Sequence, residues 1–140
     1  ISSESASRYI QLFDDTYLIY LMPRHGATNL QISSPRKVYA ADTGIRNLFT
    51  GFINKGRAFE NYVYLKLKNF DPVYVLENQR ELDFLIDNRV LVEAKYAEEI
   101  KEKQKEMYDR FDAQYKKVIK GFRDLEELEL LLEKLMAPPV

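Results

Sequence analysis

The sequence predicts an α/β fold in which a helix, three strands, a second helix and a further strand form a mixed sheet flanked by helices. Two observations carry this prediction. Residues 82–96 hold two runs of β-branched and aromatic residues around a short polar break, which is typical of a β-hairpin. The segments before and after that hairpin instead repeat their apolar residues at helical spacing. With 140 residues, the chain is long enough for one domain, or for one domain and a fragment.

The composition excludes several classes of protein. With 46% hydrophobic and 31% charged residues the chain is typical of soluble globular proteins, and no apolar run approaches the roughly 20 residues of a membrane span. It has no cysteine, which excludes thiolate metal sites and fits a cytoplasmic location. The one histidine, His25, lies in a turn-like stretch, so neither a histidine metal cluster nor a Ser-His-Asp site is expected. No Gly-x-x-x-x-Gly-Lys loop is present, so the chain does not bind ATP as a P-loop protein by itself.

The first 34 residues predict a helix followed by a two-stranded wing. Apolar residues recur at helical spacing over the first dozen positions, and strands are expected at 16–22 and around 29–32. A helix with such a wing is what remains of a winged-helix domain cut in its middle. We therefore expect a winged-helix remnant over 1–34 and a main domain over 35–140, with Ser33-Ser34-Pro35 as the linker.

The main domain is expected to open with a short strand at 38–41. Asp42 follows in a turn, where its carboxylate is expected to bond locally rather than to act as a ligand. A short helical segment is predicted at 45–49 and a longer amphipathic helix at 55–70. A proline then ends the helix, and the chain returns as a strand at 73–76.

The break at residues 87–89 sets the register of the hairpin, because a loop of three residues fixes which positions face each other. Asn88 is expected to take the positive φ angle that such a loop needs. The even-numbered positions of both strands then form one apolar face. The expected pairs are Ile86 with Val90, Phe84 with Val92 and Leu82 with Ala94.

The other face of the hairpin carries charges. Asp83 is expected opposite Glu93, with Lys95 two residues further on the same side. Two carboxylates whose Cβ atoms lie roughly 5 Å apart repel each other unless a cation lies between them, and Mg²⁺ is held in this way. The acid-x-Lys pattern also occurs at Glu99 and Lys101, but there it lies in a polar helical run. A hairpin with one solvated face and a surface ion pair is the alternative interpretation.

Glu60 lies at the edge of the apolar stripe of the helix predicted at 55–70. From there its side chain is expected to point to the margin of the sheet and to reach a metal held by the hairpin, directly or through water. The alternative is an ordinary boundary glutamate of an amphipathic helix.

After the hairpin, a helix is expected at 98–115, a short strand at 116–120 and a leucine-rich helix through Leu135. Asp124 and Glu127 are expected to form a capping box at the start of that last helix. Its leucine face is expected either to close the core or to meet another domain.

These motifs resemble a known family. The segment 81–86 followed by Val92-Glu93-Ala94-Lys95 is similar to the core of the PD-(D/E)XK nuclease superfamily, which includes archaeal Holliday-junction resolvases and many restriction enzymes. The segment 56–63 resembles the helix that supplies the additional acidic residue of this superfamily, here Glu60. The segment 104–108 resembles the Q-x-x-x-Y element of RecB-like members.

Together with Ser5 to Ile19, Lys37-Val38-Tyr39 and Asp42-Thr43-Gly44, the motifs are similar in order to the carboxy-terminal region of a prokaryotic or archaeal P-loop ATPase family. In that family an ATPase module and a winged helix precede a nuclease-like domain. The resemblance covers roughly residues 5–120. It implies a restriction-endonuclease-like core and an ATPase module in the same polypeptide.

The resemblance implies a metal-dependent DNA endonuclease that hydrolyses phosphodiester bonds. Asp83 and Glu93, with the Ala94 carbonyl, would coordinate Mg²⁺ or Mn²⁺, and Glu60 would support that ion or a second one through water. Lys95 would orient the attacking water and stabilise the charge on the phosphate.

The resemblance implies that Arg8, Gln104 and Tyr108 contact DNA. Gln104 and Tyr108 would alternatively brace the site, and Arg8 would alternatively lie on the solvated side of a capped helix. A second hypothesis keeps the fold without the chemistry: a catalytically silent module that binds DNA or a partner within a P-loop ATPase. A third is that the leucine-rich helix makes a homodimer, although such a face is more often core.

Overall fold

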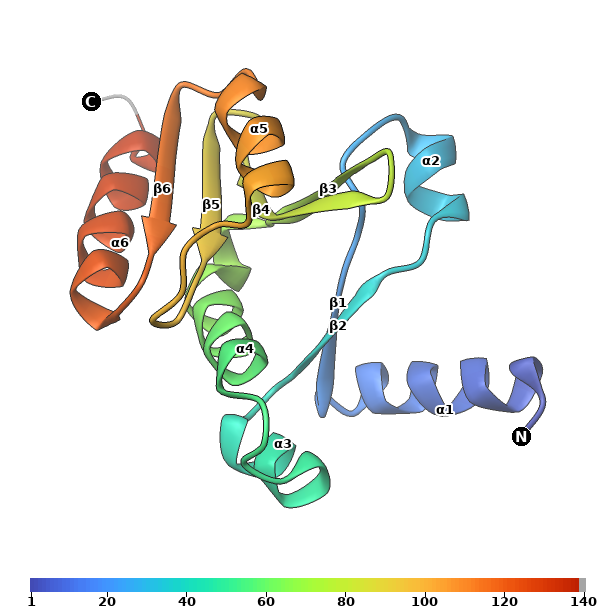
Figure 1. Cartoon of the computed structure of the whole chain (residues 1–140). Helices are drawn as coiled ribbons and strands as arrows, with labels where there is room; N and C mark the ends of the chain where they lie inside the picture. The colour runs from blue at the N-terminus through green and yellow to red at the C-terminus, as the bar shows by residue number, and fades with distance from the viewer. Residues whose placement is uncertain (139–140) are drawn as a thin grey trace.

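A computed structural model describes residues 1–138, except the side chain of Phe49, and confirms the predicted α/β class (Figure 1). The chain forms α1 (Ser3–Asp15), β1 (Ile19–Met22), α2 (Thr28–Ser33), β2 (Lys37–Ala40), α3 (Thr43–Thr50), α4 (Lys55–Leu67), a 3-10 turn (Lys68–Phe70), β3 (Val73–Glu77), β4 (Arg80–Ile86), β5 (Val90–Ala94), α5 (Glu102–Arg110), β6 (Tyr115–Ile119) and α6 (Phe122–Met136). From α4 onward, the order of helices and strands is the predicted one. No helix within residues 1–138 is long and apolar enough to cross a membrane.

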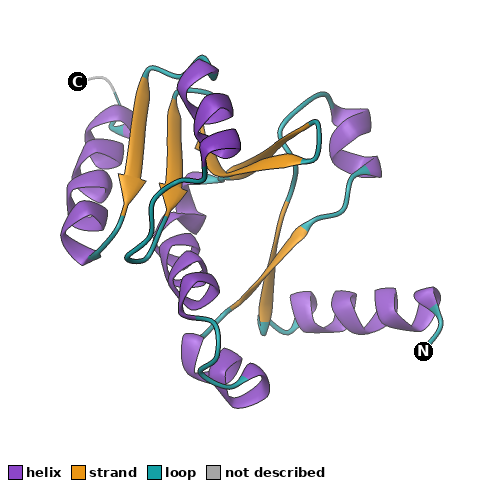
Figure 2. Cartoon of the chain, viewed as in Figure 1, coloured by secondary structure: helices purple, strands orange, loops and turns teal. Residues whose placement is uncertain are grey.

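The main sheet has four strands in the order β3, β4, β5, β6. The first two neighbouring pairs are antiparallel and β5 pairs with β6 in parallel, so the sheet is mixed as expected. Figure 2 shows helices on both sides of this sheet. The helices α4 and α6 share one buried cluster with the sheet, whereas Met107 and Tyr108 of α5 belong to the cluster on the opposite face. Because both faces are covered, every residue of β5 is buried.

The hairpin of β4 and β5 has the predicted loop and, near that loop, the predicted register. Ile86 lies opposite Val90, and Phe84 lies opposite Val92. Asn88 has a positive φ of 53°, and Asp87 before it has a φ of 51°.

The expected pair of Leu82 with Ala94 is wrong, because β4 contains a bulge. Val73 lies opposite Leu85, but Val75 lies opposite Leu82, so β4 has one residue more than β3 over this stretch. The extra residue turns Leu82 to the face of the sheet that carries Leu85, where it is fully buried. The bulge therefore changes the direction of side chains between Leu82 and Leu85, the stretch that contains Asp83.

The predicted wing is also wrong in its second strand. Residues 29–32 belong to the helix α2, and β1 pairs instead with β2, with Ile19 opposite Ala40 and Met22 opposite Lys37. A short apolar run does not distinguish a strand from a helix, and β2 occupies the edge that the predicted strand would have needed. The pairing of β1 with β2 crosses the expected division between residues 34 and 35. That division stays a prediction, and residues 139–140 of the expected second domain lie outside the described residues.

Two helices near the carboxy-terminal end differ from their predicted bounds. The helix expected at 98–115 is confined to α5, because residues 96–101 form a connection in which Ala97 has a positive φ of 53°. The last helix begins at Phe122, two residues before the expected cap. Asp124 therefore lies inside the first turn, where its carboxylate accepts hydrogen bonds from the backbone N–H groups of Lys120 and Gly121.

The leucine face of α6 closes the core. Leu125, Leu128 and Leu132 are all at most 2% exposed and lie in the cluster that α4 shares with the sheet. Of the two alternatives for this face, the structure confirms the core.

Candidate functional site

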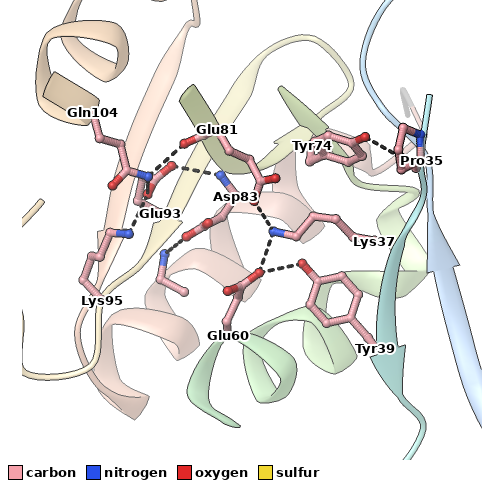
Figure 3. Close-up of polar contacts among 11 residues, drawn as sticks. Pro35, Lys37, Tyr39, Glu60, Tyr74, Glu81, Asp83, Glu93, Lys95 and Gln104 are labelled. Carbon is pink, nitrogen blue, oxygen red and sulfur yellow. Dashed lines mark hydrogen bonds and ion pairs between the residues drawn. The ribbon is translucent and has the colours of Figure 1, made fainter. Parts of the chain in front are cut away.

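Asp83 and Glu93 lie where β4 and β5 separate, and each binds the backbone of the other strand. The backbone N–H of Asp83 donates to Glu93 Oε1 at 2.9 Å, and that of Ala94 donates to Asp83 Oδ2 at 2.9 Å (Figure 3). Each carboxylate thus satisfies an N–H group beyond the last backbone pair of the hairpin. Asp83 is 6% exposed and Glu93 is not exposed, so the alternative interpretation, a hairpin with one solvated face, is wrong.

Burial decides the protonation of this pair. It raises the pKa of Glu93 to about 8, and the negative charge of Asp83 acts in the same direction. The pKa of Asp83 is also raised, first by burial and then by the negative charge of Glu60. The positive charges of Lys37 and Lys95 lower it, but they do not outweigh these two effects. Without a bound cation, the pair therefore holds a proton near neutral pH.

Two further predicted residues contact Glu93 from different elements. Lys95 Nζ lies 3.3 Å from Glu93 Oε2, and its side chain is 18% exposed. Gln104 of α5 donates from Nε2 to the same oxygen at 3.0 Å and to the backbone carbonyl of Glu81 at 2.9 Å. Gln104 therefore braces the site, as one of its two predicted roles requires (Figure 3).

The other two residues predicted to bind DNA are not brought into this group. Tyr108 is 8% exposed and packs in the cluster beneath α5. Arg8 lies on α1, which projects from the β1 and β2 pair in Figure 1, and it bonds Glu4 on its own helix at 2.9 Å. Their contacts with DNA stay predictions.

Glu60 points from α4 toward the sheet as expected, but its partners come from β2. Its Oε1 accepts hydrogen bonds from Lys37 Nζ at 2.6 Å and from the Tyr39 hydroxyl at 2.8 Å. Lys37 Nζ also donates to Glu81 Oε1 at 2.7 Å, so it bridges two carboxylates (Figure 3).

Sequence reasoning assigned no role to Lys37, Tyr39 or Glu81. A signal was present, because Lys37 and Tyr39 are two apart on a short strand and so point to one side of it. What they would face could not be read from that spacing.

The carboxylates keep Lys37 charged. Burial lowers the pKa of Lys37, but the charges of Glu60 and Asp83 and the hydrogen bonds to Glu60 and Glu81 outweigh it and raise that pKa above its ordinary value. Burial and then the charge of Glu60 raise the pKa of Tyr39, so its phenol stays a neutral donor.

The donors at the hairpin fit one hard divalent cation. Mg²⁺ is usually held by one or two carboxylates together with water and phosphate oxygens, which matches Asp83 and Glu93. Among the described residues, Asp83 Oδ1 accepts no hydrogen bond and remains available to an ion. Within residues 1–138, however, no three acidic, histidine or cysteine side chains form a group that could hold a metal, and Glu60 is engaged by Lys37.

Two hollows adjoin at Glu60. One of about 520 Å³ is lined by Lys37, Arg46, Arg57 and Glu81 besides Glu60. The other, of about 450 Å³, is lined by Arg57, Lys95 and Gln104 besides Glu60. Over the described part of the chain, neither Arg46 nor Arg57 forms an ion pair with a carboxylate.

One relative emerges from comparison with known proteins. The chain is 36% identical to an uncharacterized protein of Methanocaldococcus jannaschii over an alignment of 132 residues. The alignment covers 88% of this chain. The chain spans only 28% of the length of that relative. No protein-family model matches the chain, and no solved structure matches it.

Proposed function

We propose that this chain is a metal-dependent DNA nuclease domain that hydrolyses phosphodiester bonds. One observation carries the proposal: two buried carboxylates, Asp83 and Glu93, bind across a bulged hairpin, with the ammonium of Lys95 at 3.3 Å. Buried acids in an apolar strand are costly, and a site that binds a cation is a physical reason to keep them.

In this proposal, Asp83 and Glu93 hold the ion, and Glu60 supports the site from α4. A bound Mg²⁺ or Mn²⁺ would lower the pKa of a water and neutralise charge on the phosphate. Lys95 orients the attacking water and stabilises the negative charge that develops on the phosphate. Gln104 fixes the direction of the Glu93 carboxylate through its hydrogen bond to Oε2.

The two hollows that meet at Glu60 supply a path for the DNA backbone. Arg57 lines both hollows and Arg46 lines the larger one, neither with a carboxylate partner in the described chain, and guanidinium groups match phosphate oxygens. A local pair of arginines is compatible with a net charge of −1, since net charge does not describe how charges are distributed.

We further propose that the chain belongs to a longer polypeptide with a P-loop ATPase module. The M. jannaschii relative supports the longer polypeptide, because the chain spans only 28% of its length, whereas the ATPase module is implied by the resemblance in motif order alone. The absence of cysteine fits the reducing cytoplasm as the site of action. The homodimer stays a prediction, now without the leucine face that suggested it.

A specific observation favours a second candidate, a catalytically silent module that binds DNA or a partner. Glu60 is bound to Lys37 instead of converging with Asp83 and Glu93, and no third acid completes their pair in residues 1–138. In this alternative, Lys37 and Lys95 neutralise the acids permanently.

The two candidates are separated by assaying cleavage of linear, nicked, branched and single-stranded DNA with Mg²⁺ or Mn²⁺. We expect Lys95→Ala to abolish cleavage, and Lys103→Ala, which removes an exposed lysine of α5, to leave it unchanged. Cleavage that survives Asp83→Ala would show that the site is assigned wrongly. No cleavage by the wild type, together with DNA binding that does not depend on a metal ion, would favour the silent module.

A further inference from the structure

We propose that Lys37 is a built-in cation that occupies a second metal position, so that the domain binds one divalent ion and not two. The position is defined by the carboxylates of Glu60 and Glu81. This inference rests on the proposed metal site at Asp83 and Glu93, and it assigns the number of ions that the site takes.

The contacts of Lys37 differ from those of a surface lysine. Its Nζ lies 2.6 Å from Glu60 Oε1 and 2.7 Å from Glu81 Oε1, which are distances of strong charge-assisted hydrogen bonds. The side chains of Lys37 and Glu60 are only 19% and 22% exposed, so solvent screens the pair weakly. A cation bound to two carboxylates from different elements has the environment that a metal ion would have there.

The backbone of β2 is fixed on the core, which determines where the ammonium lies. The amide side chain of Asn61, in α4, donates to the Ala40 carbonyl at 3.0 Å and accepts from the Ala40 N–H at 2.8 Å. The ring of Tyr39 stacks on that of Tyr64 with centroids 4.1 Å apart. On the other side, Lys37 pairs with Met22 of β1, which is also buried. These contacts hold the backbone of Lys37 at a place from which its ammonium reaches both Glu60 and Glu81.

Among the acids of the site and the two lysines that neutralise them, the charges balance with one divalent ion. Four carboxylates, those of Glu60, Glu81, Asp83 and Glu93, face the two ammonium groups of Lys37 and Lys95. When all four are ionised, two positive charges are missing, and a single Mg²⁺ or Mn²⁺ supplies them. A second divalent ion would leave an excess of positive charge and would compete with Lys37 for the same oxygens.

The test is the number of Mn²⁺ ions bound, measured by calorimetry and by the loss of the free-ion electron paramagnetic resonance signal. We expect one ion for the wild type and for Lys37→Arg, which keeps the charge. We expect a second ion for Lys37→Met and its loss again in Lys37→Met with Glu60→Gln. Arg36→Met removes a positive charge from the exposed neighbouring residue and is expected to leave one ion bound.

A second measurement, the affinity for Mn²⁺, tests the inference if Lys37→Met fails to fold. The half-exposed carboxylate of Glu81 is bound by Lys37, so Glu81→Gln in the wild-type background is expected to change Mn²⁺ affinity by less than about threefold, whereas Asp83→Asn abolishes binding. Two ions in the wild type, one ion in a folded Lys37→Met, or a loss of more than about threefold in affinity on Glu81→Gln would overturn the inference. Absence of any Mn²⁺ binding by the wild type would instead overturn the proposed function.

Discussion

Glu93 shows how one buried residue connects stability with chemistry. Its carboxylate has no exposed surface and lies against Asp83, Lys95 and Gln104. In the absence of a metal ion, the raised pKa of Glu93 lets the folded protein keep a proton at pH values at which the unfolded chain has lost it.

The metal-free protein is expected to lose stability as pH rises from about 5 to about 8. The pKa of Glu93 is about 8 in the folded protein and 4.5 for the ordinary group, so the folded state binds more protons between these values. The free energy of unfolding then falls with rising pH, and the raised pKa of Asp83 adds an effect of the same sign.

The measurement is the melting temperature in EDTA at several pH values. Glu93→Gln removes the titration and is expected to flatten the curve, whereas Glu126→Gln, an exposed glutamate on α6, is expected to leave it unchanged. A wild-type melting temperature that stays constant or rises from pH 5 to pH 8 would contradict the assignment.

Elements whose register depends on nearby residues could be predicted from the sequence. The hairpin near its loop is such a case, since Ile86 and Val90 are joined by a short loop with positive φ angles at Asp87 and Asn88. The bulge in β4 could not be predicted, because strict alternation of side chains assumes a regular strand.

The positions of Asp83 and Glu93 could also be predicted, because their proximity depends on nearby residues, whereas the contact of Lys37 with the acids of the site could not. Asp83 and Glu93 are ten residues apart and joined by one hairpin, so their proximity follows from its register. Lys37 and Glu81 are 44 residues apart and meet only because β2 packs beside α4. The periodicity of the apolar residues and their secondary-structure propensities do not predict that contact, because it depends on tertiary packing.

The anchor of β2 is expected to depend on Asn61. Asn61→Ala removes both hydrogen bonds to the backbone N–H and C=O of the partly buried Ala40, which costs about 1–3 kcal/mol. Urea denaturation measures this change, and the exposed Asn69→Ala is the control, with an expected effect below about 0.5 kcal/mol. Equal effects of both substitutions would show that the two hydrogen bonds of Asn61 do not hold β2.

At the scale of the whole molecule, the sheet, α4 and the β1 and β2 pair surround the acids from three sides. Glu60, Glu81 and Lys37 come from α4, β4 and β2, and the two hollows meet beside them. The arrangement leaves Arg46 and Arg57 directed to these hollows, which is the part of the molecule where a nucleic acid is expected.

Binding of DNA is expected to depend on salt through these arginines. In the Lys95→Ala background, Arg57→Gln is expected to reduce the slope of log affinity against log salt by about 0.7–0.9, the contribution of one phosphate contact. Fluorescence anisotropy measures the slope, and Arg123→Gln on the exposed side of α6 is the matched control. An unchanged slope for Arg57→Gln would exclude this path for the DNA backbone.

The reciprocal bonds between Asp83 and Glu93 have a consequence for hydrogen exchange. The amide hydrogens of Asp83 and Ala94 are protected by carboxylate oxygens, whereas those in the regular part of the hairpin are protected by backbone carbonyls. Their exchange rates therefore report on the charge at the site, and the neighbouring amides report on the opening of the sheet. Two backbone positions can thus reveal the arrival of a cation without any substitution of the acids that bind it.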